Sequence, residues 1–258
     1  MHEVEGSGRP ELAGRGVVLT GGAGDIGAAV AAELAARGAQ LTLIDAKTAS
    51  EAKPWLERIG TDVTYVQADV RDRARVDEIL AQVDPLDIAI ANAGIVESAP
   101  ALEITQEQWE RQLGVNLTGA FNLAQAAARI LVARGRGGRI LFTGSWVQEV
   151  PWPEIAAYSV SKAGVRMLAR SFARELAQHG ILVNVLAPGI VNAGLAGRQL
   201  ATEPHYARRV EKAIPLARLQ TAAQVAKAMA FLCSADADYI TGSVLLADGG
   251  ASLFHSDD

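Results

Sequence analysis

Tyr158 and Lys162 stand one helical turn apart, 13 residues after Ser145. Residues separated by four positions share a helix face, so the lysine ammonium can lie beside the tyrosine phenol. At an effective dielectric near 20, a charge about 4 Å away is worth roughly 4 kcal/mol, which would lower a phenol pKa from about 10 to near neutrality. The pair therefore predicts proton transfer by Tyr158, the alternative being two side chains that merely share an exposed face.

A glycine-rich segment, TGGAGDIG, follows an apolar run at residues 16–20. Gly21 and Gly27 permit tight turns and close backbone approach, and the free N–H groups of the helix that starts here can bind a pyrophosphate. A glycine turn that only caps a helix is the alternative.

The next apolar run ends in Asp45, 18 residues after Gly27, which is the spacing of a carboxylate that binds an adenosine ribose. Because Asp45 would accept the ribose hydroxyls and repel a 2′-phosphate, the pattern predicts NAD. Lys47, two positions later, keeps NADP open.

Together these residues resemble the short-chain dehydrogenase/reductase family, from about residue 12 to Gly250. The family's glycine pattern, TGxxxGxG, contains Thr20, Gly21 and Gly27 here, with Asp25 in place of the middle glycine. We expect Asp25 to act as the N-cap of the helix, with its carboxylate turned away from the pyrophosphate.

The resemblance also implies contacts farther along the chain. Residues 69–70 match the family's adenine contact, residues 92–94 its NAG motif, and residues 188–191 the turn that flanks the nicotinamide. The family often has a threonine where this chain has Ala193, so one hydroxyl contact is missing, and whether Asn192 replaces it stays open. The implied cofactor-binding residues are Gly21, Asp25, Ile26, Gly27, Asp45, Asp69, Val70, Asn92, Ala93, Gly94, Tyr158, Lys162, Pro188, Gly189 and Val191.

Asn116, Ser145, Tyr158 and Lys162 match the family's catalytic tetrad. The mechanism that the resemblance implies is hydride transfer between a carbinol or carbonyl carbon and C4 of nicotinamide. Tyr158 as phenolate takes the hydroxyl proton, and Ser145 orients the substrate oxygen. Lys162 lowers the tyrosine pKa and binds the nicotinamide ribose, while Asn116 holds a water in a proton relay behind the lysine.

The loop at residues 146–157 combines aromatic and hydrogen-bonding side chains, a mixture that suits a polyhydroxylated ring. Its PWP segment, with ADGGASLF near the C-terminus, resembles the glucose 1-dehydrogenase branch of the family. We therefore expect a sugar or polyol substrate, although Trp146 and Trp152 could equally pack only the loop or a subunit interface. Val147 replaces that branch's histidine and Glu97 stands one position from its acidic residue, so glucose itself stays open. The expected substrate residues are Glu97, Ser145, Val147, Gln148, Trp152, Tyr158 and Arg198.

Residues 193–214 interrupt the strand and helix alternation and resemble the family's substrate-covering insertion. They carry Arg198, Arg208, Arg209 and Lys212, and arginine forks bind carboxylate, phosphate and sulfonate groups well. An anionic sugar is therefore a second substrate class, and a solvated helix face is the alternative.

Two further functions stay open. Within the family, 3-oxoacyl thioester or hydroxysteroid reduction is possible, but Asp45 and the polar loop argue against it. A cofactor-binding regulatory protein without catalysis is the other, and the complete tetrad argues against it.

Seven apolar runs of strand length alternate with longer helix-like segments. They lie at residues 16–20, 40–45, 63–67, 86–92, 139–144, 181–187 and 243–248. This alternation predicts one α/β domain over residues 1–258, with a Rossmann-type, doubly wound, seven-stranded parallel sheet and helices on both faces. Ligands then bind outside the carboxyl ends of the strands, where the motifs fall. Residues 1–11 are expected to form a flexible tail.

Composition narrows the remaining possibilities. The formal charge of −5 over 258 residues provides no basic surface for nucleic acid or anionic membranes. Four scattered histidines and the single Cys233 lack metal-ligand spacing, so no metal is expected. A polar beginning and the lack of a long apolar stretch predict a cytoplasmic location. The apolar helices expected at residues 121–133 and 164–177 predict a homodimer or homotetramer.

Overall fold

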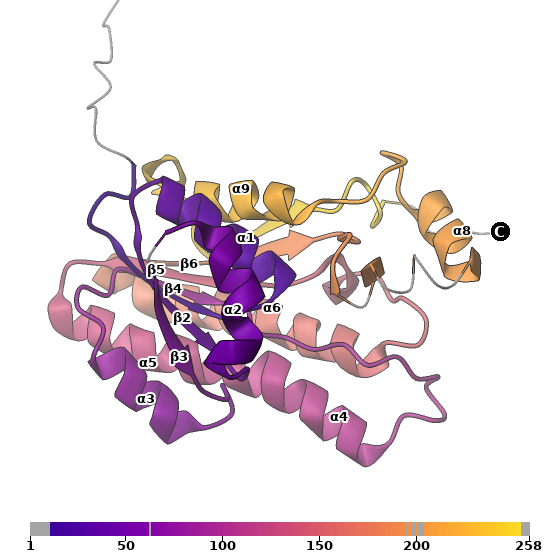
Figure 1. Ribbon diagram of the computed structural model, residues 1–258, viewed down its shortest axis with the longest axis horizontal. Coiled ribbons are helices and arrows are strands. Elements are labelled where there is room, and N and C mark those ends of the chain that lie inside the picture. Colours follow the sequence, from indigo (N-terminus) through magenta and orange to yellow (C-terminus); the bar gives the residue numbers. More distant parts are fainter. Residues whose placement is uncertain (1–10, 62, 195, 198–199, 201–203, 254–258) are drawn as a thin grey trace, which may run out of the picture.

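Seven parallel strands form one sheet in the computed structural model (Figure 1). The structure describes residues 11–253 except 62, 195, 198–199 and 201–203, and the side chains of 204–206 and 211 are also outside the description. The strand order is β3-β2-β1-β4-β5-β6-β7. The strands are β1 (Gly16–Thr20), β2 (Gln40–Asp45), β3 (Thr64–Gln67), β4 (Ile88–Ala91), β5 (Gly138–Thr143), β6 (Ile181–Pro188) and β7 (Val244–Ala247).

Helices cover both faces of this sheet (Figure 1). One face carries α1 (Asp25–Ala36), α2 (Ala49–Ile59) and α9 (Ala222–Cys233). The other carries α3 (Arg73–Ala81), α4 (Gln106–Leu113), α5 (Gly119–Arg134) and α6 (Ala156–Leu176). A π-helical segment (Gly114–Thr118) joins α4 to α5, and α8 (Pro204–Ala213) lies in the segment between β6 and α9.

Strand β1 illustrates why the sheet is buried on both sides. Val17 and Leu19 join the apolar core under α1 and α9, whereas Val18 points to the opposite core, formed with α3, α5 and α6. Alternate residues of a strand face opposite sides, so only an apolar run without interruption can serve two cores. The predicted doubly wound fold is confirmed.

The strand order reverses direction next to β1, which pairs with β2 on one side and with β4 on the other. The connection that leaves β1 runs to one face of the sheet, and the connection that leaves β4 runs to the other. A crevice opens between them, at the carboxyl ends of these two strands. The predicted strand bounds agree with the observed ones to within two residues. Residues 1–10 lie outside the described part, so the flexible tail stays a prediction. None of the helices described is both long and apolar enough to cross a bilayer.

Candidate active site

A cavity of about 730 Å³ opens at the carboxyl ends of β1, β4, β5 and β6. It lies within the range of roughly 300–1,000 Å³ that is typical of ligand sites. The predicted site residues that line it are Gly21, Asp25, Ile26, Gly27, Asp45, Asp69, Val70, Asn92, Ala93, Gly94, Ser145, Val147, Trp152, Tyr158, Lys162, Pro188, Gly189 and Val191. The cavity thus joins the expected cofactor residues to three members of the tetrad.

The glycine-rich loop has no room for side chains at two positions. Gly21 has a φ of +69°, and a Cβ there would lie 2.8 Å from the Ala93 Cα. A Cβ on Gly27 would lie 2.0 Å from the Gly21 carbonyl oxygen. Helix α1 starts just after Gly24, and no side chain of the described residues caps its first turn. Its amides are therefore available to an anion, which fits the pyrophosphate of a dinucleotide.

Asp25 is not the N-cap of α1, contrary to the sequence prediction. The helix starts at Asp25 itself, with Gly24 as the cap residue. The Asp25 carboxylate instead accepts hydrogen bonds from the Trp55 indole N–H and the Gly194 amide, both at 3.1 Å. Arg58 lies 3.6 Å from the same carboxylate. Partners from α2 and from the segment after β6 thus replace the local capping bond that the sequence suggested.

Asp45 places a carboxylate at the end of β2, in the part of the cavity that the sequence pattern assigns to an adenosine ribose. It accepts hydrogen bonds from the Ala23 amide at 2.9 Å and from the Lys47 amide at 3.1 Å. The Lys47 ammonium donates to the Ala23 carbonyl at 2.6 Å and lies 4.4 Å from the centre of the Trp55 ring. The carboxylate and the ammonium are therefore both held by the cofactor loop.

Asp69 lies at the neighbouring strand end and is bound by Arg71, with 2.6 Å between Nη2 and Oδ2. The guanidinium holds the pKa of Asp69 below its usual value, so this carboxylate is charged. Arg71 itself lines the cavity. The end of the cavity that the resemblance assigns to adenine is therefore polar and contains charges of both signs.

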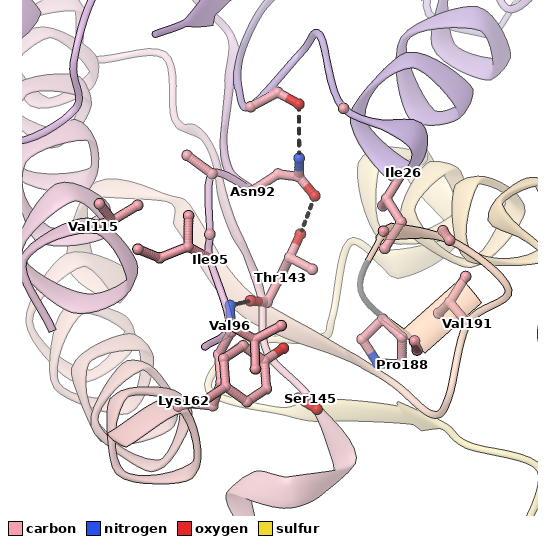
Figure 2. Close-up of a pocket in the computed structure, with 18 of the residues that line it drawn as sticks. Ile26, Asn92, Ile95, Val96, Val115, Thr143, Ser145, Lys162, Pro188 and Val191 are labelled. Carbon is pink, nitrogen blue, oxygen red and sulfur yellow. Dashed lines mark hydrogen bonds between the residues drawn. The ribbon is translucent and has the colours of Figure 1, made fainter. Parts of the chain in front are cut away.

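Asn92 ties the ends of three strands together (Figure 2). Its amide nitrogen donates to the Thr20 carbonyl at 3.1 Å, and its amide oxygen accepts from the Thr143 hydroxyl at 3.0 Å. The side chain is thus held by β1 and β5, and the next residues, Ala93 and Gly94, line the cavity. Both polar atoms of the Asn92 side chain therefore bind other parts of the protein and hold the cavity wall in place.

Asn116 lies in the π-helical segment and is buried behind the cavity wall. Its amide accepts from the Ile95 N–H at 2.8 Å and donates to the Ile95 carbonyl at 2.9 Å and to the Ser161 hydroxyl at 3.0 Å. A Cβ placed on Gly94 would lie 3.4 Å from the Asn116 amide oxygen and 3.5 Å from the Lys162 ammonium. Asn116 is therefore near the lysine, as predicted, and its water relay stays a prediction.

Lys162 is buried, and its ammonium donates to the Thr143 carbonyl at 2.7 Å (Figure 2). Burial lowers the pKa of Lys162 to about 8. The ammonium lies 5.5 Å from the centre of the Tyr158 ring. Burial raises the pKa of Tyr158, and a hydrogen bond with Ser145 acts in the opposite direction. The predicted titration of Tyr158 near neutrality is therefore wrong for this structure, because desolvation of the phenol outweighs its hydrogen bond with Ser145.

Aromatic and apolar side chains form the substrate end of the cavity. Trp146 and Trp152 pack edge to face, with 5.3 Å between ring centres. The Arg209 guanidinium from α8 lies 4.9 Å from the centre of the Trp152 ring. Trp146 also packs with Val147 and Ile190. Both tryptophans line the cavity, and Trp146 is buried, so packing of the loop is observed and contact with a substrate stays a prediction.

Two expected substrate residues do not line the cavity. Glu97 is held by Arg111 of α4, with 2.7 Å between Nε and Oε1, and it is Arg111 that lines the cavity. Gln148 is buried behind Gly144, where an added Cβ would lie 2.6 Å from the Gln148 amide oxygen. Arg198 lies outside the described residues. A direct substrate contact by Glu97 or Gln148 is not supported, because each side chain faces another part of the protein.

Arg111 and Glu154 line the cavity without having been identified as site residues from the sequence. Arg111 lies in an ordinary polar helix, which gives no local signal. Glu154 has a φ of +68°, a strained value for a residue with a side chain, and its carbonyl accepts from the Ala99 amide at 2.8 Å. Its place just before the tyrosine helix, after a PWP segment, was the available signal. Within the described residues no cluster of three or more His, Cys, Asp or Glu could hold a metal ion.

Comparisons with known proteins agree with this geometry. The family described as enoyl-(acyl carrier protein) reductase matches residues 21–252. The 3beta-hydroxysteroid dehydrogenase 1 of Eggerthella lenta is 35% identical over 95% of this chain and 96% of its own length. The 3-oxoacyl-[acyl-carrier-protein] reductase MabA of Mycobacterium tuberculosis is 36% identical over 96% of each chain. A crystal structure of a gluconate 5-dehydrogenase from Burkholderia cenocepacia, in complex with NADP and tartrate, has a TM-score of 0.87 and 33% identity, covering 96% of this chain and 98% of the other.

Proposed function

The chain belongs to the short-chain dehydrogenase/reductase family, and from this membership we propose that it is an NAD-dependent dehydrogenase of a sugar or polyol. The reaction is hydride transfer between a carbinol or carbonyl carbon and the nicotinamide of the dinucleotide. One observation carries the proposal: Ser145, Tyr158 and Lys162 line the same cavity as the glycine-rich loop that fits a pyrophosphate.

Each residue of the tetrad has a distinct part in this reaction. The Tyr158 hydroxyl exchanges a proton with the substrate oxygen, and Ser145, hydrogen-bonded to Tyr158, orients that oxygen. When bound, the nicotinamide accepts or supplies the hydride. Lys162 is held in place by the Thr143 carbonyl, and Asn116 fixes the backbone of Ile95 beside it.

The substrate end of the cavity supports a sugar acid as the preferred substrate class. Aromatic faces such as those of Trp146 and Trp152 suit the C–H faces of a polyhydroxylated chain or ring, and the Arg209 guanidinium suits a carboxylate. The gluconate 5-dehydrogenase that resembles this chain was solved with tartrate, a hydroxy acid. Arg208 and Lys212 are exposed and do not line the cavity, so Arg209 is the residue of the insertion that supports this class.

The cofactor preference is proposed to be NAD. The Asp45 carboxylate lines the cavity at the end of β2, where a 2′-phosphate would meet its negative charge. Lys47 also lines the cavity, but its ammonium is bonded to the Ala23 carbonyl. The related gluconate 5-dehydrogenase binds NADP, so NADP is the competing cofactor.

A second candidate function is reduction of a hydroxysteroid or a 3-oxoacyl thioester. Trp146, Val147, Ile155 and Ile190 give the substrate end a large apolar surface. Such a surface suits a steroid ring or an acyl chain, and the two relatives described above act on these classes by name. Arg209 at the cavity favours the sugar acid over this candidate.

A panel assay at 340 nm tests these candidates. NADH formation is measured with sugar acids, neutral sugars and polyols, and NADH or NADPH consumption with 3-oxoacyl thioesters and 3-oxosteroids. The proposal expects the highest kcat/KM with a sugar acid and NAD. Highest efficiency with a thioester or a steroid would establish the second candidate instead. Binding of NADH without turnover of any compound would indicate a regulatory protein.

Assembly into a homodimer or homotetramer is also proposed. Val160 and Met167 of α6 are 48% and 59% exposed, and large apolar side chains on one helix are typical of an interface between subunits. Sedimentation velocity of the purified chain distinguishes monomer, dimer and tetramer.

A further inference from the structure

Asp25 joins three segments of the chain that are far apart in sequence. Its carboxylate lies at the start of α1, beside the cofactor cavity. One oxygen accepts from the Trp55 indole of α2 at 3.1 Å, and the other accepts from the amide of Gly194 at 3.1 Å. Gly194 lies in the chain that follows β6, six residues after Pro188, and also lines the cavity.

We infer that Asp25 is a positioning residue that fastens Gly194, in the chain that follows β6, to the start of α1. The inference goes beyond the proposed function, because it concerns what holds one part of the cavity wall in place and not what reacts in the cavity.

The local geometry shows why the loop tolerates aspartate here. Asp25 is the first residue of the helix and has no need of the positive φ that demands glycine at Gly21. A carboxylate near a helix start is favourable by itself, but it competes with the pyrophosphate for the same positive end of the helix. Arg58, 3.6 Å away, offsets part of that negative charge. The arrangement therefore retains a charge that does not help the cofactor, which points to a different use of the carboxylate.

The hydrogen bond from the Gly194 amide is a use of the Asp25 carboxylate that does not involve the cofactor. Gly194 has a φ of +54°, and nothing lies within 4 Å of an added Cβ, so its side-chain space is open. The neighbouring amides are held by backbone partners: Asn192 donates to the Gln220 carbonyl at 2.9 Å, and Ala193 donates to the Val191 carbonyl at 2.8 Å. The Gly194 amide is instead held by Asp25, across a sequence separation of 169 residues.

Two differences from the family pattern thus meet in space. Asp25 replaces a glycine of the loop, and Ala193 replaces the frequent threonine of the turn after β6. The segment lacks the hydroxyl at residue 193, and the adjacent residue is fastened to residue 25.

Hydrogen exchange of the Gly194 amide, measured by mass spectrometry with fragmentation on the ligand-free chain, tests the inference. In Asp25→Ala we expect Gly194 to exchange about fivefold to tenfold faster, as for the loss of one hydrogen bond. Residues 21–27 should keep their exchange rates. The Kd of NADH, measured by fluorescence, should fall, because a negative charge has left the pyrophosphate end.

Two further variants separate the bond from the charge. Arg58→Ala removes the ion pair only, and Gly194 should stay protected. The double variant Asp25→Asn, Trp55→Phe has no charge at residue 25. Because the Trp55 donor is also gone, the single amide oxygen of the asparagine is available to the Gly194 N–H, so the Gly194 amide should again be protected from exchange. Unchanged exchange of Gly194 in Asp25→Ala, or an equal rise across residues 21–27, overturns the inference. Because these measurements need no substrate, their failure is distinct from failure of the proposed function.

Discussion

The Lys162 ammonium is held 2.7 Å from the Thr143 carbonyl, at the carboxyl end of β5. This bond fixes a cation in a buried part of the cavity wall, 5.5 Å from the centre of the Tyr158 ring. The protein therefore maintains a charged group where water does not solvate it, which costs stability and is typical of functional sites.

Replacing Tyr158 tests its role in proton transfer. Tyr158→Phe keeps the ring and removes the hydroxyl, so kcat should fall by roughly 10²–10⁴-fold, the usual contribution of general acid–base catalysis. NADH binding, followed by fluorescence, should change little. Turnover close to that of the wild type would exclude Tyr158 as the proton-transfer residue.

The buried lysine should make stability depend on pH. Its pKa is about 8 in the folded chain against 10.5 as a free side chain. Burial of the Lys162 ammonium lowers the free energy of unfolding. This destabilisation reaches its full size below pH 8, where the lysine is charged in both states, and disappears as the pH rises to about 10.5. Lys162→Met should therefore gain about 3 kcal/mol relative to the wild type on going from pH 10.5 to pH 7.5. Urea unfolding of the ligand-free proteins measures this difference, and a difference that does not vary with pH contradicts the burial argument.

Asp45 is expected to set the preference for NAD. Asp45→Asn keeps an oxygen for the Ala23 amide and removes the charge that opposes a 2′-phosphate. Like charges a few ångströms apart repel by a few kcal/mol at an effective dielectric of about 20, so the ratio of kcat/KM for NADP to that for NAD should rise about tenfold or more. Asp69→Asn is the matched control and should leave the ratio unchanged, because Asp69 is bound by Arg71. Equal ratios in all three proteins would show that Asp45 does not select the cofactor.

Arg209 is expected to select anionic substrates. Arg209→Met should raise the KM for a sugar acid by roughly 10-fold to 100-fold, the range for a lost hydrogen bond to a charged group. The KM for a neutral polyol should not change. Arg208→Met, an exposed neighbour outside the cavity, is the control. If the Arg209 and Arg208 variants behave alike toward both substrates, the guanidinium has no part in recognition.

Gly24 and Gly27, in the glycine-rich loop at residues 21–27, should differ in whether they tolerate a side chain. A Cβ on Gly27 would lie 2.0 Å from the Gly21 carbonyl oxygen, whereas on Gly24 the nearest atom would be 3.5 Å away. Gly27→Ala should therefore abolish measurable NADH binding or destabilise the fold by about 3 kcal/mol or more, and Gly24→Ala should be tolerated. Calorimetric titration with NADH and thermal melting compare the two variants, and equal behaviour would contradict the packing argument.

Much of the fold followed from local patterns. The strands at residues 16–20 and 40–45 have the bounds predicted for them, because an apolar run bounded by polar or glycine residues marks a doubly buried strand without knowledge of its neighbours. The cofactor loop and the Tyr158–Lys162 pair were found in the same way, since their spacing along one turn or one helix fixes their geometry.

The sequence alone therefore determined the family, the parallel sheet and the order of the cofactor and catalytic residues. The tertiary structure decided what those residues contact: Asp25 reaches Gly194 and does not cap its own helix, Glu97 binds Arg111, and Arg209 lies over Trp152. It also decided that burial raises the pKa of Tyr158 despite the nearby lysine. The reason is physical. Helix and strand periodicity arise from neighbours along the chain, whereas side-chain partners and desolvation depend on segments that only folding brings together.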